Sequence, residues 1–111
     1  MRIAVVAVAL ASLLLGVTQS GSAQAQADFF RGKTLTMLIG YTSGGGYDLY
    51  ARVLSKHMGR HIPGSPSIVP QNMPGAGSLR VANVLYNVAS KDGLTIGMIG
   101  RGVMRVEAEV I

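Results

Sequence analysis

The sequence contains no cysteine, and this absence sets the first limit on its class. Small exported domains often depend on disulfides for stability, so a chain without cysteine is not built on a disulfide framework. Acidic residues are also few, five against ten Lys and Arg, which gives a formal net charge of +5. The basic residues are spread without a run, and aromatic residues make up only 5 %. Nucleic acid is therefore not an expected partner, because its binding needs a clustered basic patch with interleaved aromatics.

Common catalytic and metal-binding patterns are missing as well. The segment 40–44 misses the G-x-S-x-G nucleophile elbow by one position, and no G-x-x-x-x-G-K-[ST] phosphate loop is present. His57 and His61 have i, i+4 spacing, but without an H-E-x-x-H pattern we expect structural histidines rather than metal ligands. The sequence thus predicts a protein that is not an enzyme, with no catalytic residue, no metal site and no cofactor.

The N-terminal segment has the pattern of an export signal. Arg2 supplies a positive start, residues 3–17 form an apolar run, and two overlapping A-x-A sites follow. We predict a secretory signal peptide, residues 1–27, cleaved after Ala27 or, as second choice, after Ala25. A retained membrane anchor is the alternative, but the run is shorter than the ~20 residues that a spanning helix needs.

Removal of the signal leaves residues 28–111, which are 84 residues with a net charge of +4. This length suffices for one small domain at most. Export without cysteine fits a bacterial periplasmic protein, and we expect no stable membrane insertion after cleavage.

Residues 28–111 alternate predicted strands with predicted helices. Short apolar runs between turn signals indicate strands, and 3.6-residue periodicity indicates helices. The strands are expected at 34–40, 67–72 and 94–100, and the helices at 47–62 and 78–89. The order β-α-β-α-β is typical of an α/β fold with a parallel sheet. Pro70 lacks a donor N–H, which places the second strand at an edge or in a bulge.

Each predicted helix has one apolar side that should pack on the sheet. In the first helix this side comprises Tyr47, Tyr50, Ala51, Leu54, Met58 and Ile62. In the second it comprises Leu79, Ala82, Leu85, Tyr86 and Ala89. Ser78 is the expected N-cap of the second helix.

Glycine-rich loops follow all three predicted strands. Ligands of open α/β sheets bind at the carboxyl ends of the strands, where a helix start with free N–H groups can hold an anion. The candidate ligand-binding residues are Tyr41, Thr42, Ser43, Gly44, Gly45, Gly46, Asp48, Gly75, Ala76, Gly77, Ser78 and Arg101. The alternative is that the glycines merely permit tight turns.

Two charged candidates have two possible roles each. Asp48 could complement the dipole and cap the first helix, or accept a hydrogen bond from a ligand. Arg101 could pair with a second ligand carboxylate, or be a solvated loop residue.

Three ordered motifs resemble the Bug-type extracytoplasmic solute receptors of tripartite tricarboxylate transporters. GYTSGGGYDLYAR at 40–52 is similar to the first ligand loop of that family, and NMPGAGS at 72–78 to its second signature. KDGLTIGMIGRG at 91–102 resembles the Asp-Gly turn and third strand. Three positions depart from the family pattern, namely Tyr47, Ser78 and Arg101.

The resemblance implies a periplasmic binding protein-like fold, of which residues 28–111 would be the truncated N-terminal part of lobe 1. It also implies capture of a small organic carboxylate, such as a di- or tricarboxylate, for delivery to a membrane permease. The first two loops would hold the carboxylate largely through backbone amides, which nominates residues 41–46 with Asp48, and 75–78. The second lobe is absent from residues 28–111, so we expect no tight capture from them alone.

Two other functions stay open at this point. The chain could be a truncated and inactive remnant, or a receptor that reports its ligand to a sensor kinase rather than to a permease. The sequence does not separate these alternatives, and it leaves the ligand open.

Overall fold

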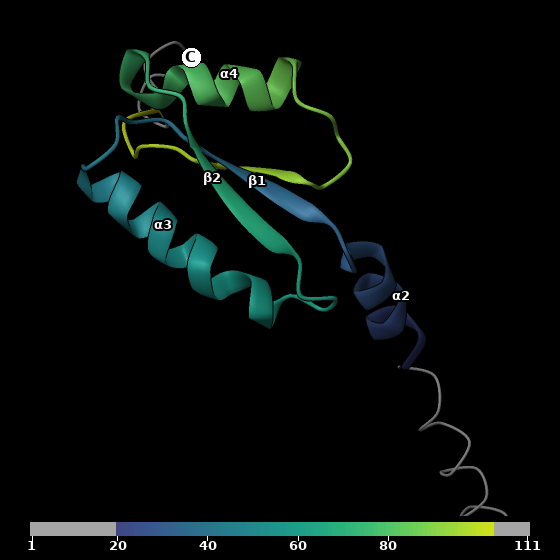
Figure 1. Ribbon diagram of the computed structural model, residues 1–111. Coiled ribbons are helices and arrows are strands. Elements are labelled where there is room, and N and C mark those ends of the chain that lie inside the picture. Colours follow the sequence, from purple (N-terminus) through teal and green to yellow (C-terminus); the bar gives the residue numbers. More distant parts are fainter. Residues whose placement is uncertain (1–19, 104–111) are drawn as a thin grey trace, which may run out of the picture.

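The computed structural model describes residues 20–103, and these residues have the α/β order that the sequence predicts (Figure 1). The strands are β1 (Thr34–Ile39), β2 (Ser67–Asn72) and β3 (Thr95–Met98), joined by the helices α3 (Gly46–Met58) and α4 (Leu79–Asn87). They form one parallel sheet in the order β2-β1-β3. The predicted α/β fold with a parallel sheet is therefore confirmed, and its form is compatible with part of a periplasmic-binding-protein lobe. The apolar run of the predicted signal, residues 3–17, lies outside the described residues.

The two connecting helices cover opposite faces of the sheet (Figure 1). The chain leaves the central strand β1 toward β2 and then crosses back over β1 to reach β3. Because both crossovers are right-handed by the usual rule, the change of direction places α3 on one face and α4 on the other. All three strands consequently end at one edge, where the glycine-rich loops follow.

The core lies between α3 and the sheet. Met37 and Ile39 of β1 pack there with Ala51 of α3, and all three are buried. Half-buried side chains that complete this cluster are Met58, Ile68, Ile96 and Met98. The predicted strand at 34–40 is thus confirmed as β1, which is largely buried and is the only strand with neighbours on both sides among the described residues.

The packed side of α3 differs from the predicted one. Asp48, Ala51 and Ser55 are its buried residues, whereas Tyr50 and Leu54 are 69 % and 44 % exposed. Small side chains let α3 approach the sheet closely, and the Ser55 hydroxyl donates to the Ala51 carbonyl at 2.8 Å. The apolar periodicity therefore predicted the helix correctly. Its predicted buried side was partly wrong, because it included the exposed residues Tyr50 and Leu54.

The end of the first predicted helix is also earlier than expected. The α-helix stops at Met58 and continues as the short 3₁₀ turn η1 (Gly59–His61), so Ile62 is extended. At Gly59 the backbone lies so close to the Pro66 carbonyl that an added Cβ would overlap it. This close approach turns the chain toward β2.

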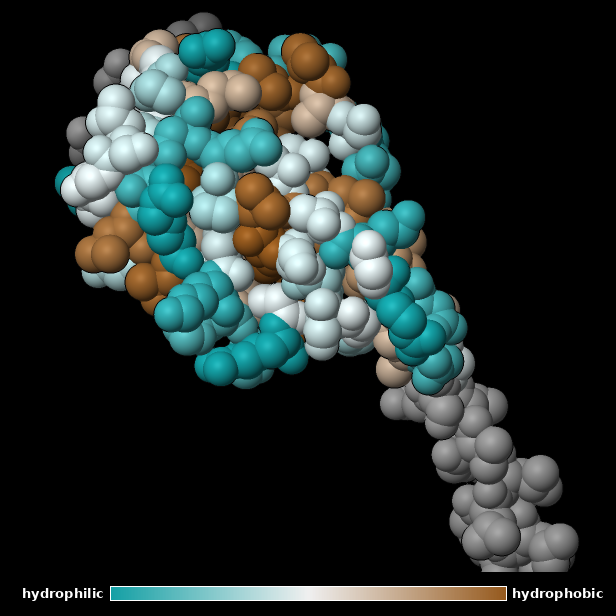
Figure 2. Space-filling model, viewed as in Figure 1, coloured by the Kyte–Doolittle hydropathy of each residue, from teal (hydrophilic) through white to brown (hydrophobic). Residues whose placement is uncertain are grey.

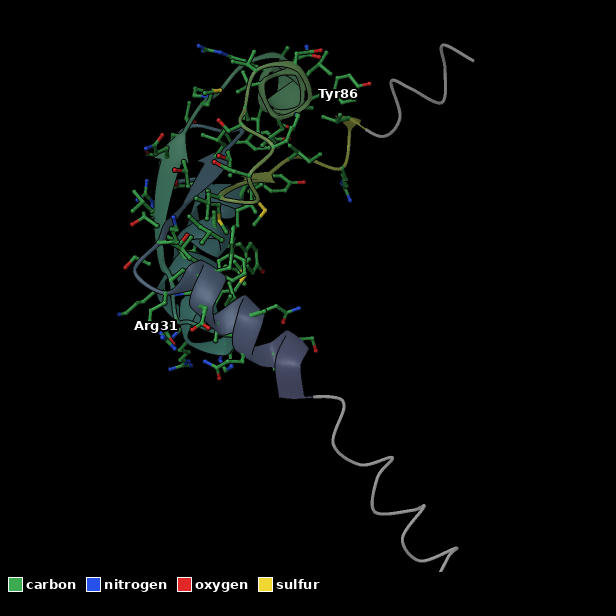
Figure 3. All side chains as sticks on the ribbon, turned by 90° about the vertical axis from the view of Figure 1, so that its right-hand side faces the viewer. Arg31 and Tyr86 are labelled. Atoms are coloured by element: carbon green, nitrogen blue, oxygen red, sulfur yellow. The ribbon has the colours of Figure 1, made fainter. Side chains whose placement is uncertain are left out.

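Helix α4 follows the short 3₁₀ turn η2 (Ala76–Ser78) and is shorter than the predicted 78–89. Val81 is its buried residue and was missed, while Tyr86, predicted to pack, is 81 % exposed. Figure 3 shows the Tyr86 side chain projecting away from the sheet. Ser78 occupies the N-cap position but makes no capping hydrogen bond, so its predicted capping role is wrong.

Pro70 lies in β2, and β2 is an edge strand, as predicted. The N–H groups of Ser67 and Met73 donate to Lys33 and Ile39, on the β1 side. Because successive N–H groups of a strand alternate in direction, the nitrogen of Pro70 points away from β1. The proline therefore removes no hydrogen bond from the sheet.

Helix α2 (Ser20–Phe30) lies at the amino end of β1, opposite the glycine-rich loops (Figure 1). Its last turn packs on Gly64, where an added Cβ would overlap the Ala27 carbonyl.

The expected cleavage points, after Ala25 or Ala27, lie within α2, and signal cleavage stays a prediction. No helix within residues 20–103 has the length and apolar character needed to cross a membrane.

Candidate functional site

The first glycine-rich loop joins β1 to α3 and is exposed from Thr42 to Gly46. Gly44 has a φ of +92°, which an L side chain rarely adopts. Gly45 has a φ of −83° and is the N-cap of α3, and Gly46 begins the helix. Of the three glycines, only Gly44 has a backbone conformation that requires glycine. At Gly45 the absence of a side chain leaves the surface of the loop open.

Asp48 fixes this loop from the inside. Its side chain is buried in the first turn of α3, and its carboxylate accepts the Gly44 N–H at 2.9 Å. Arg52 donates through Nε to both carboxylate oxygens at 3.0 Å. The negative charge near the start of α3 also complements the helix dipole. In this structure the carboxylate thus stabilises the loop and the helix start.

The same contacts change the acidity of Asp48. The Arg52 hydrogen bond, then the Gly44 N–H and the Asn72 amide, lower the pKa of Asp48 from 3.8 to about 2. Each of these donors favours the ionised form, and together they outweigh the opposing effect of burial. The loop is therefore held by a carboxylate that stays ionised in mildly acidic solution.

Asn72, the last residue of β2, connects the first loop to the second strand. Its side-chain N–H₂ donates to the Tyr41 carbonyl at 2.9 Å and to Asp48 at 2.8 Å. Its amide oxygen accepts from Ser43 and from Arg52, at 3.1 and 2.8 Å. We did not predict this role from the sequence, although an amide side chain at the carboxyl end of a strand is a usable signal.

The second glycine-rich loop has an unusual backbone. Four consecutive residues, Gly75 to Ser78, have positive φ values, of 150°, 47°, 59° and 75°. Ala76 and Ser78 are not glycine, so the left-handed conformation costs about 1–3 kcal/mol at each of them. Such strain persists only where the surrounding contacts enforce it, and it is more frequent at ligand sites.

Ser78 provides those contacts. It is fully buried, and its hydroxyl accepts the Gly100 N–H of the third loop at 2.6 Å. Its Cβ lies against Gly40 at the end of β1, where an added Cβ would overlap it. Ser78, in the second loop, thus contacts the residues that follow β1 and β3.

An open hollow of about 620 Å³ lies over the first and third loops. It is lined by Tyr41, Tyr47, Arg101 and Gly102. A neighbouring hollow of about 250 Å³ shares Tyr41 and Gly102 and reaches Ala76 and Gly77 of the second loop. The predicted convergence of three loops at one edge is therefore present in the structure.

The predicted site residues fall into three groups by exposure. Asp48 and Ser78 are buried, and Tyr41 is half-buried. The exposed residues are Thr42, Ser43, Gly44, Gly45, Gly46, Gly75, Ala76, Gly77 and Arg101.

Two residues of this region, Asn72 and Tyr47, were not among the site residues predicted from the sequence, although Tyr47 lines the larger hollow. His57 and His61 are exposed and lie away from the loops, at the other end of α3 and in η1.

Comparison with known proteins gives one informative similarity. The chain is 38 % identical over 99 residues to a curated protein of Cupriavidus necator named "UPF0065 protein in gbd 5'region". The similar region covers 89 % of this chain but only 29 % of that protein, so the chain spans less than a third of its relative. No family model and no solved structure matches the chain.

Proposed function

We propose that this chain is part of a Bug-type solute receptor that binds a small organic carboxylate. The observation that carries the proposal is the convergence of three glycine-containing loops at Ser78, beside two adjoining hollows. Exposed backbone N–H groups of such loops suit an anionic group.

The similarity to a UPF0065 protein supports the same conclusion. UPF0065 denotes the Bug-type receptor family, and the similar region includes nearly all of the present chain. In such a receptor the chain would supply the opening part of one lobe, in the periplasm, and a membrane permease would receive the ligand. In a complete receptor the remainder of the cleft would come from further residues, which correspond to the part of the relative outside the similar region.

The polar residues of the loops have separate roles in this proposal. Asp48 holds the first loop in place and does not itself contact the ligand, since its carboxylate is already bound by three donors. Arg101 lines the larger hollow and pairs with a ligand carboxylate. The Ser43 hydroxyl donates to an amide oxygen of Asn72, which is not a general base, and this contact favours binding over catalysis.

The proposal is tested by titrating succinate, glutarate and citrate into the ¹⁵N-labelled chain and following amide shifts by NMR, which detects weak binding. We expect saturable shifts concentrated in the loops that follow β1, β2 and β3. Gly45→Val should weaken binding at least tenfold, because its side chain would cover the loop while the φ of −83° tolerates it.

Ser90→Val is the matched control, since it adds the same side chain to an exposed residue between α4 and β3, at the opposite edge. It should leave the affinity unchanged. Absence of any saturable shift, or equal affinity of the Gly45→Val protein, would contradict the proposed site.

A further inference from the structure

Two tyrosines flank the first glycine-rich loop and stack on each other. Tyr41 follows the end of β1 and Tyr47 lies in the first turn of α3, and their ring centroids are 4.4 Å apart with planes inclined by 7°. The positive φ of Gly44 belongs to the chain reversal that brings the rings together. The loop thus places a parallel pair of aromatic rings beside its own glycines.

The third loop holds both rings at their hydroxyl ends. The Arg101 N–H donates to the Tyr47 hydroxyl at 3.4 Å. The Tyr41 hydroxyl occupies the space that a Cβ of Gly100 would need, so glycine at this position makes room for the ring. The pair consequently bridges the first and third loops, and its position is fixed without a ligand.

This ring pair forms a wall of the larger hollow. Further lining residues are Arg101, the cation of the third loop, and Gly102, whose added Cβ would meet no neighbour within residues 20–103. The volume of about 620 Å³ is within the range of small-molecule sites. An aromatic wall and a guanidinium in one hollow fit a flat π-system that carries a negative charge.

We propose that the receptor selects planar aromatic carboxylates, which stack on the Tyr41–Tyr47 pair and direct the carboxylate toward Arg101. The inference rests on the proposed carboxylate-binding function and specifies its substrate class. Aliphatic carboxylates satisfy the cation equally well but lack a π-face for the rings. The ring pair is therefore the determinant of specificity, while the loop amides and Arg101 recognise the charge.

Benzoate and cyclohexanecarboxylate are suitable probes, because they have equal charge and similar size but differ in aromaticity. Each is titrated into the ¹⁵N-labelled chain. We expect benzoate to bind about fivefold more tightly, with its ring protons shifted upfield by the tyrosines. Equal affinity for the two probes, without an upfield shift, would overturn the aromatic selectivity and leave the carboxylate receptor standing.

Variants assign the selectivity to the ring pair. Tyr47→Leu should remove the preference for benzoate and leave cyclohexanecarboxylate binding within about twofold, whereas Tyr47→Phe should retain the preference. Tyr50→Leu is the matched control, because Tyr50 is 69 % exposed on α3 and does not line the hollow. The amide spectrum of each variant reports whether its fold is intact. A preference that persists in a folded Tyr47→Leu protein would overturn the assignment, and failure of every carboxylate to bind would overturn the receptor function itself.

Discussion

Single polar residues hold the loops of this protein, and they act from buried positions. Asp48 and Ser78 are both candidate ligand residues, and each is buried and bound to the backbone of a loop, at Gly44 and Gly100. Of the two roles that the sequence left open for Asp48, these contacts support the stabilisation of the helix start, and ligand contact by either residue stays a prediction. Sequence patterns nominate a residue by its position in a motif. They do not show whether its side chain points outward to a ligand or inward to support the loop, because that depends on contacts between distant segments.

Acid titration tests the role of Asp48. Its pKa of about 2 in the folded chain is below its ordinary value of 3.8. Its ionised form therefore stabilises the fold fully above about pH 4, and this contribution is lost as the pH falls toward 2. We expect Asp48→Asn to be less stable than the native chain at pH 6, with the difference narrowing between pH 4 and pH 2 in urea unfolding followed by circular dichroism.

Asp92→Asn is the control for this titration. Asp92 is exposed, and its Oδ1 accepts the Leu94 N–H, a contact that an asparagine oxygen can replace. Its stability should follow that of the native chain throughout the same pH range. Parallel stability curves for the native and Asp48→Asn chains from pH 6 to pH 2 would contradict the role assigned to Asp48.

The positions of the strands were predicted from the sequence more accurately than the packing of the helices. The bounds of β2 agree with the prediction, and β1 and β3 lie within their predicted ranges. The buried sides of α3 and α4 were only partly predicted, because Tyr50 and Tyr86 are exposed. Tyrosine is apolar enough to appear in a helical stripe, whereas close helix-sheet packing here selects small residues.

The contact between α4 and β3 depends on the absence of a side chain at Gly97. An added Cβ there would overlap the end of Leu85 and lie 3.2 Å from Val81 Cγ1. Because Leu85 is flexible at its end, we expect Gly97→Ala to lower the free energy of unfolding by only about 1 kcal/mol, and Gly97→Val by about 2–3 kcal/mol. Urea unfolding of both variants measures the difference.

A double-mutant cycle shows whether Leu85 is the cause. Combining Gly97→Val with Leu85→Ala should cost less than the sum of the single changes, by about 1 kcal/mol. Gly102→Ala is the matched control, since an added Cβ at Gly102 meets no atom of the described residues within 4 Å. Strict additivity of the two changes would show that Gly97 is needed for another reason.

The whole molecule is organised around β1, which pairs with both neighbouring strands. Its residues Leu35, Met37, Leu38 and Ile39 are buried, whereas β2 alternates between exposed and half-buried residues. Hydrogen exchange should therefore be slowest at the amides of Met37, Leu38 and Ile39, because these open only when the sheet itself opens. Amide exchange measured by NMR tests this order, and equally slow exchange in α4 would contradict it.

The exposed apolar side of α3 is a second property of the whole molecule. Leu49, Val53 and Leu54 are 63, 50 and 44 % exposed. Together with Tyr50 they form a side of α3 that no described residue covers. In Figure 2 the surface over α3 is largely hydrophilic on the side that faces the viewer, with hydrophobic residues at the left edge of the molecule. The sequence periodicity predicted that Tyr50 and Leu54 of this side pack on the sheet. An apolar stripe does not by itself show which side of a helix the sheet occupies.

The position of Pro70 gives the sheet a direction of growth. Its nitrogen lies on the outer edge of β2, where a further strand would find no donor at the centre of the ladder. The outer edge of β3 contains no proline from Thr95 to Met98. An additional strand, from a longer form of the chain or from a second molecule, would thus form a more complete ladder of hydrogen bonds at β3, on the side of Gly100 and Arg101. A single imino acid thereby disfavours growth of the sheet beyond β2, on the side away from Arg101.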